Sequence, residues 1–270
     1  MDRDIAVDLR YEIEACVARG AVGEVLRARD RESGARVAIK RLHEHLVTGE
    51  GTSRLIAEAE RLAAVKSPHV VTCAGWGRDA TERPCLVLKW LDGEDLGRMR
   101  DVTIAEAVEI ARQTAEGLGA IHAAGLVHGD VKPSNILVSR ATGEPHVWLI
   151  DLGLARKIGE KDPTLRGRLV GTPSFMSPEQ ARGDESLTPA SDLFSLGIVL
   201  YELLAKQRPF TGSDSFAVLA KIRSEDPPRL GSIAPQVPAS IEAAVMRALE
   251  KPLGRRFRQA ADFVDALTSR

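Results

Sequence analysis

The sequence predicts an α+β fold in two lobes, a β-rich N-terminal lobe with one main helix and an α-helical C-terminal lobe. Residues 11–88 hold short apolar runs separated by turns, a pattern typical of strands. After residue 93 the apolar spacing becomes helical. We therefore expect one domain over residues 1–270, with the N-lobe at about 1–88, a hinge at 89–92 and the C-lobe at 93–270.

The expected elements of the first part alternate in type. Strands are predicted at residues 11–18, 23–30 and 36–42, with a turn at 31–35. A helix is predicted over residues 53–65, because Leu55, Ala59 and Leu62 recur at helical spacing. The apolar run that begins at Leu86 indicates a further strand, which ends in a turn near Gly93.

The second part is expected to be mostly helical. Residues 103–125 place apolar side chains on one face, and Gly125 is a typical C-terminal stop. Residues 136–139 and 146–151 indicate a small hairpin. Residues 191–206 are apolar nearly all round, which predicts a central buried helix. The other helices are predicted at residues 215–223, 239–250 and 259–270.

Composition excludes several classes of function. Lys and Arg total 37 and Asp and Glu total 38, so the net charge of −1 provides no basic field for nucleic acid or anionic lipid. The three cysteines are far apart, which fits neither a disulfide framework nor a paired zinc site. No signal-peptide core and no run of about 18 apolar residues occurs. We expect a cytoplasmic chain without a membrane segment and without nucleic acid as a partner.

Three polar residues indicate phosphoryl transfer. Asp130 and Asn135 lie in the segment HGDVKPSN, and Asp151 follows in WLIDLG. A carboxylate can position an acceptor hydroxyl, and metal ions on oxygen ligands can neutralise phosphate charge. A lone Asp in a loop is more often a turn or cap residue, so the interpretation depends on the surrounding motifs.

The order of those motifs resembles the protein kinase catalytic domain, in particular the bacterial Ser/Thr kinases of the eukaryotic-like type. The resemblance covers almost the whole chain. Its parts are the Gly-rich loop VARGAVGEV, VAIK, a helical glutamate, a hinge, HGDVKPSN, DLG, SPE and a later aspartate in SDLFSLG. It implies a kinase that transfers the γ-phosphoryl group of ATP to protein Ser or Thr, with autophosphorylation.

The resemblance also implies how ATP is bound. Lys40 would contact the α- and β-phosphates and pair with Glu58; Glu60 is the competing partner, but Leu55 and Leu62 mark the inward face beside Glu58. Ala18 stands where the family has its first glycine, and Leu88 is the expected gatekeeper. The full set of ATP-binding residues is Ala18, Gly20, Gly23, Val25, Ala38, Lys40, Leu88, Lys89, Leu91 and Leu137.

The catalytic and scaffold roles follow from the same resemblance. Asp130 would accept or orient the hydroxyl proton, and Lys132 would steady the transferring phosphate. Asn135 and Asp151 would coordinate Mg²⁺, with Mn²⁺ as the alternative ion. Thr172 would bridge Asp130 and Lys132, Asp192 would hold the catalytic loop, and Glu179 would pair with Arg255 or Arg256. The sequence leaves the choice between the two arginines open.

The main departure from the family pattern is Gly129, which stands where the family usually has Arg before the catalytic Asp. That arginine grips a phosphate on the activation loop. Its absence defines a non-RD kinase, for which we expect weak dependence on phosphorylation of Thr164, although Arg156 or Lys157 offers another cation. Leu152 and Ser177 replace the usual Phe and Ala and are mild changes.

Two other functions compete with this interpretation. His-Gly-Asp also occurs in small-molecule kinases that act on aminoglycosides and choline, but those enzymes lack the Lys132-Pro133 pattern and the segment GTPSFMSPEQ. A pseudokinase or scaffold module would keep the fold without the chemistry, yet Lys40, Glu58 and Asp130 are all present. Tyrosine specificity is disfavoured by Lys132 and Thr172. A homodimer through the N-terminal lobe is implied by the resemblance alone.

Overall fold

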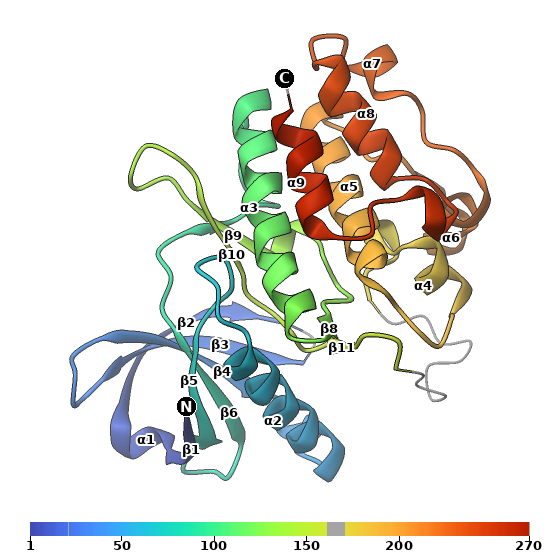
Figure 1. The fold of residues 1–270 in the computed structure, drawn as a ribbon. Helices are drawn as coiled ribbons and strands as arrows, with labels where there is room; N and C mark the ends of the chain where they lie inside the picture. Colours follow the sequence, from blue (N-terminus) through green and yellow to red (C-terminus); the bar gives the residue numbers. More distant parts are fainter. Residues whose placement is uncertain (21, 161–170, 270) are drawn as a thin grey trace. The chain divides into compact units, whose positions relative to one another are not determined.

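The computed structural model describes residues 1–20, 22–160 and 171–269. These residues form two compact units, each with its own core. Among the described residues, the first comprises 1–20, 22–66, 70–92 and 151–153, and the second comprises 67–69, 93–150, 154–160 and 171–269. In Figure 1 the first is mainly sheet and the second mainly helix.

The first unit is built on a sheet with the strand order β1-β5-β6-β4-β3-β2. Helix α2 (Gly49–Ala64) packs against β5 and β6. Its N-cap residue is Thr48, whose side chain accepts a hydrogen bond from the N–H of Gly51. The strands are β1 (Asp2–Ala6), β2 (Tyr11–Arg19), β3 (Gly23–Asp30), β4 (Arg36–Leu42), β5 (Cys73–Arg78) and β6 (Pro84–Lys89). The short helices are α1 (Val7–Arg10) and the 3₁₀ turn η1 (Glu44–Leu46).

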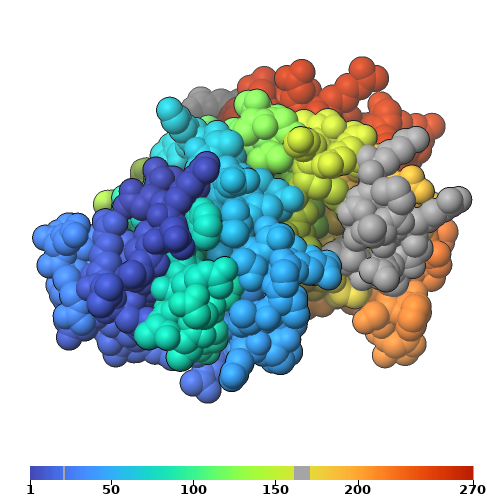
Figure 2. Space-filling view, turned by 90° about the horizontal axis from the view of Figure 1, so that it is seen from below, coloured from blue at the N-terminus to red at the C-terminus, as the bar shows by residue number. Residues whose placement is uncertain are grey.

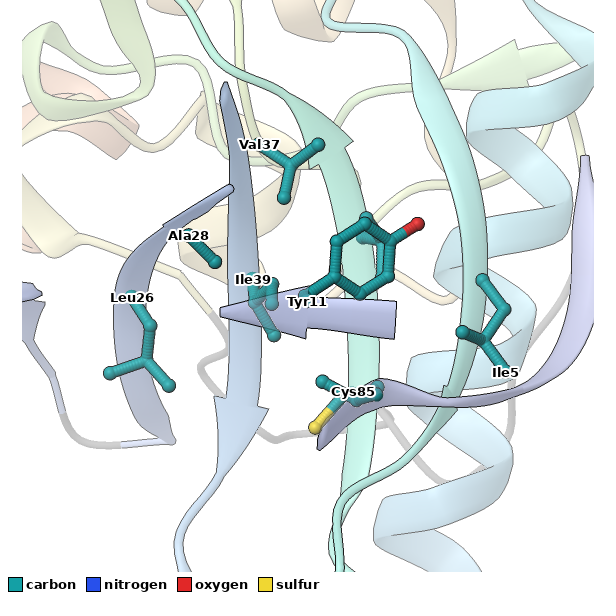
Figure 3. Packing of buried hydrophobic residues seen from close by; sticks show 9 residues of the cluster. Ile5, Tyr11, Leu26, Ala28, Val37, Ile39 and Cys85 are labelled. Carbon is teal, nitrogen blue, oxygen red and sulfur yellow. The ribbon is translucent and has the colours of Figure 1, made fainter. Parts of the chain in front are cut away.

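The core on one side of this sheet follows from the two-residue period of its strands. Val37 and Ile39 alternate with Ala38 and Lys40 along β4, so the first two face the core and the last two face the opposite side. Figure 3 shows the resulting cluster. Its members are Ile5, Val7, Tyr11, Leu26, Ala28, Val37, Ile39, Cys85 and Val87.

Strand β1 was not expected from the sequence, which predicts the first strand only at Tyr11. It runs parallel to β5 and extends the sheet at that edge; Figure 2 shows the N-terminal residues in dark blue beside the teal segment near residue 80. Two glycines of β5 make room for it, because a Cβ at Gly77 would lie 2.0 Å from the carbonyl oxygen of Ile5 and one at Gly75 would lie 2.4 Å from that of Asp2.

The second unit is organised around α5 (Pro189–Ala205), whose residues are buried on nearly every side, as its sequence predicts. It packs against α3 (Ile104–Ala123), α8 (Ala239–Ala248) and α9 (Ala260–Thr268), as Figure 1 shows. Gly125 follows α3 with a φ of +76°, a left-handed conformation that glycine adopts without strain. The remaining helices are α4 (Pro178–Arg182), α6 (Ser215–Ser224) and α7 (Leu230–Ile233).

Short strands and turns carry the polar segments of this unit. The predicted hairpin is formed by β9 (Ile136–Ser139) and β10 (His146–Leu149), and β7 (Glu94–Asp95) pairs with β9. Strand β8 (Leu126–Val127) pairs with β11 (Arg156–Lys157). The 3₁₀ turns are η2 (Pro133–Asn135), η4 (Pro173–Phe175) and η5 (Leu253–Arg255). Within the described ranges, no helix is both long and apolar enough to span a bilayer.

Candidate active site

Lys40 and Glu58 form an ion pair within the first unit. Nζ of Lys40 lies 2.8 and 2.9 Å from the two carboxylate oxygens of Glu58. Glu58 is buried on α2 between Leu55 and Leu62, one helical turn to either side, so the apolar face of the helix carries the carboxylate inward. Glu60 instead is exposed and lies 4.0 Å from Arg3.

Asp151 belongs to the same unit and extends this cluster. Its Oδ2 lies 3.4 Å from Nζ of Lys40, and its Oδ1 accepts a hydrogen bond of 2.7 Å from the N–H of Gly153. Burial disfavours the charge of Lys40, but the negative charges of Glu58 and Asp151 outweigh it and raise its pKa. Lys40 is therefore positively charged at neutral pH.

Several expected nucleotide-binding residues share one face of the sheet with Lys40. Val25 is opposite both Lys40 and Ala18 in its strand pairings, and Ala38 is opposite Leu88. Residues that oppose each other in antiparallel strands project to the same face, as do residues two apart. Lys40, Val25, Ala38 and Leu88 thus form one surface, opposite the core of Figure 3.

The two glycines of the expected phosphate loop differ in their surroundings. A Cβ at Gly23 would lie 2.1 Å from the carbonyl oxygen of Arg41, so packing alone requires glycine there. A Cβ at Gly20 would meet nothing closer than 3.9 Å, and its N–H donates to the carbonyl of Gly23. The sheet therefore explains Gly23, whereas Gly20 has no packing reason to be glycine.

The remaining nucleotide-binding candidates lie at the end of β6, just after it, and on β9. Lys89 is the last residue of β6, and its N–H donates to the carbonyl of Thr72 at 2.9 Å. Leu91 lies two residues further along the chain, and Leu137 lies on β9 in the second unit, opposite Asp95. The N–H of Lys89 is therefore already used, which leaves carbonyls and the N–H of Leu91 as candidate contacts for a ligand.

Asp130 lies at the centre of a polar cluster in the second unit. Its Oδ2 accepts hydrogen bonds from Nζ of Lys132 at 2.6 Å and from Nδ2 of Asn135 at 3.1 Å. The hydroxyl of Thr172 donates to its Oδ1 at 3.4 Å and accepts from Lys132 at 3.0 Å. The structure thus brings together the carboxylate, the lysine, the amide and the threonine that the sequence singles out.

Asp192 holds the loop that carries Asp130. Its two carboxylate oxygens accept hydrogen bonds from the N–H groups of His128 and Gly129, both at 2.8 Å. Nε2 of His122 lies 2.8 Å from Asp192 Oδ2. Burial raises the pKa of Asp192, but His122, His128 and the N–H of Gly129 lower it further, so the net shift is downward and the group is ionised.

Glu179 pairs with Arg256, so the structure decides between the two arginines that the sequence left open. Nη1 and Nη2 of Arg256 lie 3.0 and 3.1 Å from the two carboxylate oxygens, and both side chains are buried. Arg255 is exposed and lies 3.9 Å from Glu250. Thr164 lies outside the described residues.

The sequence did not single out His122 and Gln180, which contact Asp192 and Gly129 beside the Asp130 cluster. Nothing in the spacing of His122 and Asp192, which are 70 positions apart, indicates their contact. Gln180 donates a hydrogen bond of 2.7 Å to the carbonyl of Gly129. The pattern Ser-x-x-Gln at residues 177–180, typical of a capping box, was the available signal for Gln180.

The geometry and the motifs define the class of the protein. The family model for the protein kinase domain matches residues 11–257, and the chain belongs to this family. The family and the α+β fold predicted from the sequence are confirmed.

Its relatives narrow the class further. Serine/threonine-protein kinase PknA of Mycobacterium tuberculosis is 34% identical over 269 residues, which cover 96% of this chain and 61% of that protein. Serine/threonine-protein kinase Pkn1 of Myxococcus xanthus is 35% identical over 257 residues, which cover 93% of this chain and 37% of the relative. The chain thus spans from about a third to three fifths of these relatives and is similar to bacterial proteins named Ser/Thr kinases.

Proposed function

We propose that this chain is a Ser/Thr protein kinase that transfers the γ-phosphoryl group of Mg-ATP to hydroxyls of proteins, its own included. The observation that carries the proposal is the cluster in which Lys132 bridges Asp130 and Thr172. This arrangement orients a carboxylate and places a cation beside it. A transferring phosphoryl group needs both features.

In the proposed reaction Asp130 accepts the proton of the acceptor hydroxyl. A bond forms from that oxygen to the γ-phosphorus while the bond to the β-phosphate oxygen breaks. Lys132 lies 2.6 Å from Asp130 and offsets negative charge at the reacting oxygens. Lys40, held by Glu58, binds the α- and β-phosphates.

Asn135 and Asp151 fit the role of metal ligands by their chemistry. Mg²⁺ prefers oxygen donors, and Mn²⁺ accepts the same set. Both hydrogen bonds of the Asn135 side chain use its nitrogen, to the backbone carbonyl and to Oδ2 of Asp130, so its amide oxygen remains as the coordinating atom. Bound Mg²⁺ supplies neutralisation of the phosphate charge.

The decisive test is transfer of labelled γ-phosphate from ATP to the chain itself, to a generic basic protein and to kanamycin. Label on protein Ser or Thr that Asp130→Asn abolishes supports the proposal. Label on kanamycin alone identifies a small-molecule phosphotransferase. ATP binding without any transfer identifies a pseudokinase.

Glu58→Gln is expected to lower kcat/KM by about 10²-fold, because the neutral amide no longer holds the ammonium of Lys40 in place and small displacements in an active site have effects of this size. Glu60→Gln is the matched control on the same helix, since Glu60 is exposed. Steady-state kinetics with varied ATP measure both variants. Equal losses in the two variants would contradict the assigned role of Glu58.

Thr164→Ala is expected to change the initial rate by less than about tenfold, because Gly129 removes the arginine through which loop phosphorylation orders the site in other kinases. Initial rates of wild type that has been allowed to autophosphorylate and of the variant measure the effect. A loss of about a hundredfold or more would contradict the expected weak dependence on loop phosphorylation, and Arg156 and Lys157 would then be the candidate cations for the phosphate.

The proposed partners are proteins with accessible Ser or Thr residues in the cytoplasm. A homodimer through the N-terminal unit remains a prediction from the resemblance. Sedimentation of the purified chain over a range of concentrations tests it.

A further inference from the structure

Gly129 has a backbone conformation that glycine adopts without strain. Its φ is +76°, in the left-handed region, and a Cβ there would lie 3.1 Å from the carbonyl oxygen of Leu154. The same absence of a side chain gives this residue the greatest backbone freedom. Because Gly129 directly precedes Asp130, contacts from elsewhere must restrict that freedom if the carboxylate is to have one position.

Side chains from two different helices bind the polar groups of Gly129. Its N–H donates to Oδ1 of Asp192 on α5 at 2.8 Å. Its carbonyl accepts from Nε2 of Gln180 on α4 at 2.7 Å. The N–H of Asp130, which shares a rigid peptide plane with that carbonyl, donates to Nδ1 of His128 at 3.2 Å. A rotation about the Cα–C bond of Gly129 would move both this carbonyl and Asp130. Such a rotation therefore breaks the bond to Gln180.

The orientation of the Gln180 amide is determined by its other end. Its Oε1 accepts hydrogen bonds from the N–H of Ser177 at 3.0 Å and from the Ser177 hydroxyl at 3.1 Å. A backbone N–H can only donate, so the oxygen of the amide must face Ser177 and the nitrogen must face Gly129. Gln180 is only 7% exposed as a residue, so water does not readily replace either partner.

Helix α4 is itself firmly held. Glu179, the residue before Gln180, makes the buried ion pair with Arg256. Gly183 ends the helix in the left-handed conformation, and its N–H bonds the carbonyl of Gln180. The bond from Gln180 therefore connects the loop to a fixed support.

We propose that Gln180 is a positioning residue for the catalytic loop, which holds the Gly129–Asp130 peptide and thereby the direction of the Asp130 carboxylate. The inference rests on the proposed kinase function. It predicts that Gln180 acts on the chemical step and leaves nucleotide binding nearly unchanged.

Three variants separate this role from the capping of α4. Gln180→Glu keeps an acceptor for Ser177, the arrangement of an ordinary capping box, but its ionised carboxylate has no hydrogen to donate to Gly129. Gln180→Met removes both bonds at similar size. Ser177→Ala removes the capping hydroxyl and leaves the bond between Gln180 and Gly129 in place.

We expect Gln180→Glu to lower kcat about tenfold at about pH 8, with the KM for ATP within about twofold of wild type. Ser177→Ala should lower the melting temperature and retain kcat. Hydrogen exchange of the peptide over residues 126–136 should be faster in Gln180→Glu and Gln180→Met than in wild type and Ser177→Ala. Hydrogen exchange is measured without catalytic turnover, so it tests the positioning role independently of activity.

The activity of Gln180→Glu relative to wild type should rise as the pH falls, because burial raises the pKa of the introduced carboxyl and its protonated form can again donate to Gly129. Gln180→Met has no titrating group and should show no such recovery. The titratable groups on the surrounding elements are the same in wild type and in every variant. Their own effect on activity therefore cancels in the ratio of variant activity to wild-type activity. These groups are His128, Asp130, Glu179, Arg182, Asp192, Tyr201, Glu202, Lys221, Arg223 and Arg256.

The proposal is overturned if Gln180→Glu leaves kcat and exchange unchanged. It is also overturned if Ser177→Ala lowers kcat as much as Gln180→Glu does, since capping alone would then explain the loss. If wild type transfers phosphate to no acceptor, the proposed function fails. The exchange pattern then decides the positioning role alone, with faster exchange in both Gln180 variants supporting it and unchanged exchange rejecting it.

Discussion

Asp130→Asn is expected to lower kcat by about 10²–10⁴-fold, the range that a positioned general base contributes, while ATP binding is retained. The amide that replaces the carboxylate cannot accept the hydroxyl proton. Phosphate transfer under single-turnover conditions measures the chemical step, and equilibrium titration with a fluorescent nucleotide measures binding. A variant with normal single-turnover rates would exclude Asp130 as the base.

The surroundings of Asp130 should accept the substitution without unfolding. The amide oxygen can take the place of Oδ2 and accept from Lys132 and Asn135. The amide nitrogen then takes the place of Oδ1, 3.4 Å from the hydroxyl of Thr172, which can accept a hydrogen bond as well as donate one. The melting temperature should therefore stay close to that of wild type. The exposed Asp184, paired with Arg182, provides the control Asp184→Asn, which should retain full activity.

Periodicity and motif order were sufficient to predict the elements that bury an apolar face. The helix around Leu55 and Leu62 and the central helix α5 are examples, because local spacing alone determines which of their side chains face inward. The same reasoning favours Glu58 over Glu60 from the sequence, and Lys40 contacts Glu58 in the structure.

Contacts between distant residues were harder to predict, since the sequence carries no local sign of them. Strand β1 is mostly charged and exposed, and its pairing depends on the close approach that Gly75 and Gly77 permit some 70 residues later. The two adjacent arginines are chemically identical, and only the way the chain leaves η5 buries Arg256 and exposes Arg255.

Arg256→Ala is expected to lower the free energy of unfolding by about 3–5 kcal/mol, the usual cost of leaving one charge of a buried ion pair without its partner. Arg256 is fully buried, pairs with both carboxylate oxygens of Glu179, and donates to the backbone carbonyls of Glu250 and Lys251. Its loss leaves all of these acceptors without their donor. Urea denaturation followed by circular dichroism measures the change.

The pair should also give the difference in stability a defined pH dependence. Burial raises the pKa of Glu179, but Arg256 lowers it further, so the net shift is downward. The contribution of the pair is therefore present above the ordinary glutamate pKa of about 4.3 and is lost as the pH falls through the lowered folded value. The difference in the free energy of unfolding between wild type and Arg256→Ala should therefore become smaller as the pH falls through that range.

Arg255→Ala is the matched control, and because Arg255 is exposed it should change the free energy of unfolding by less than about 1 kcal/mol. Equal losses in the two variants would show that the buried pair has no special role.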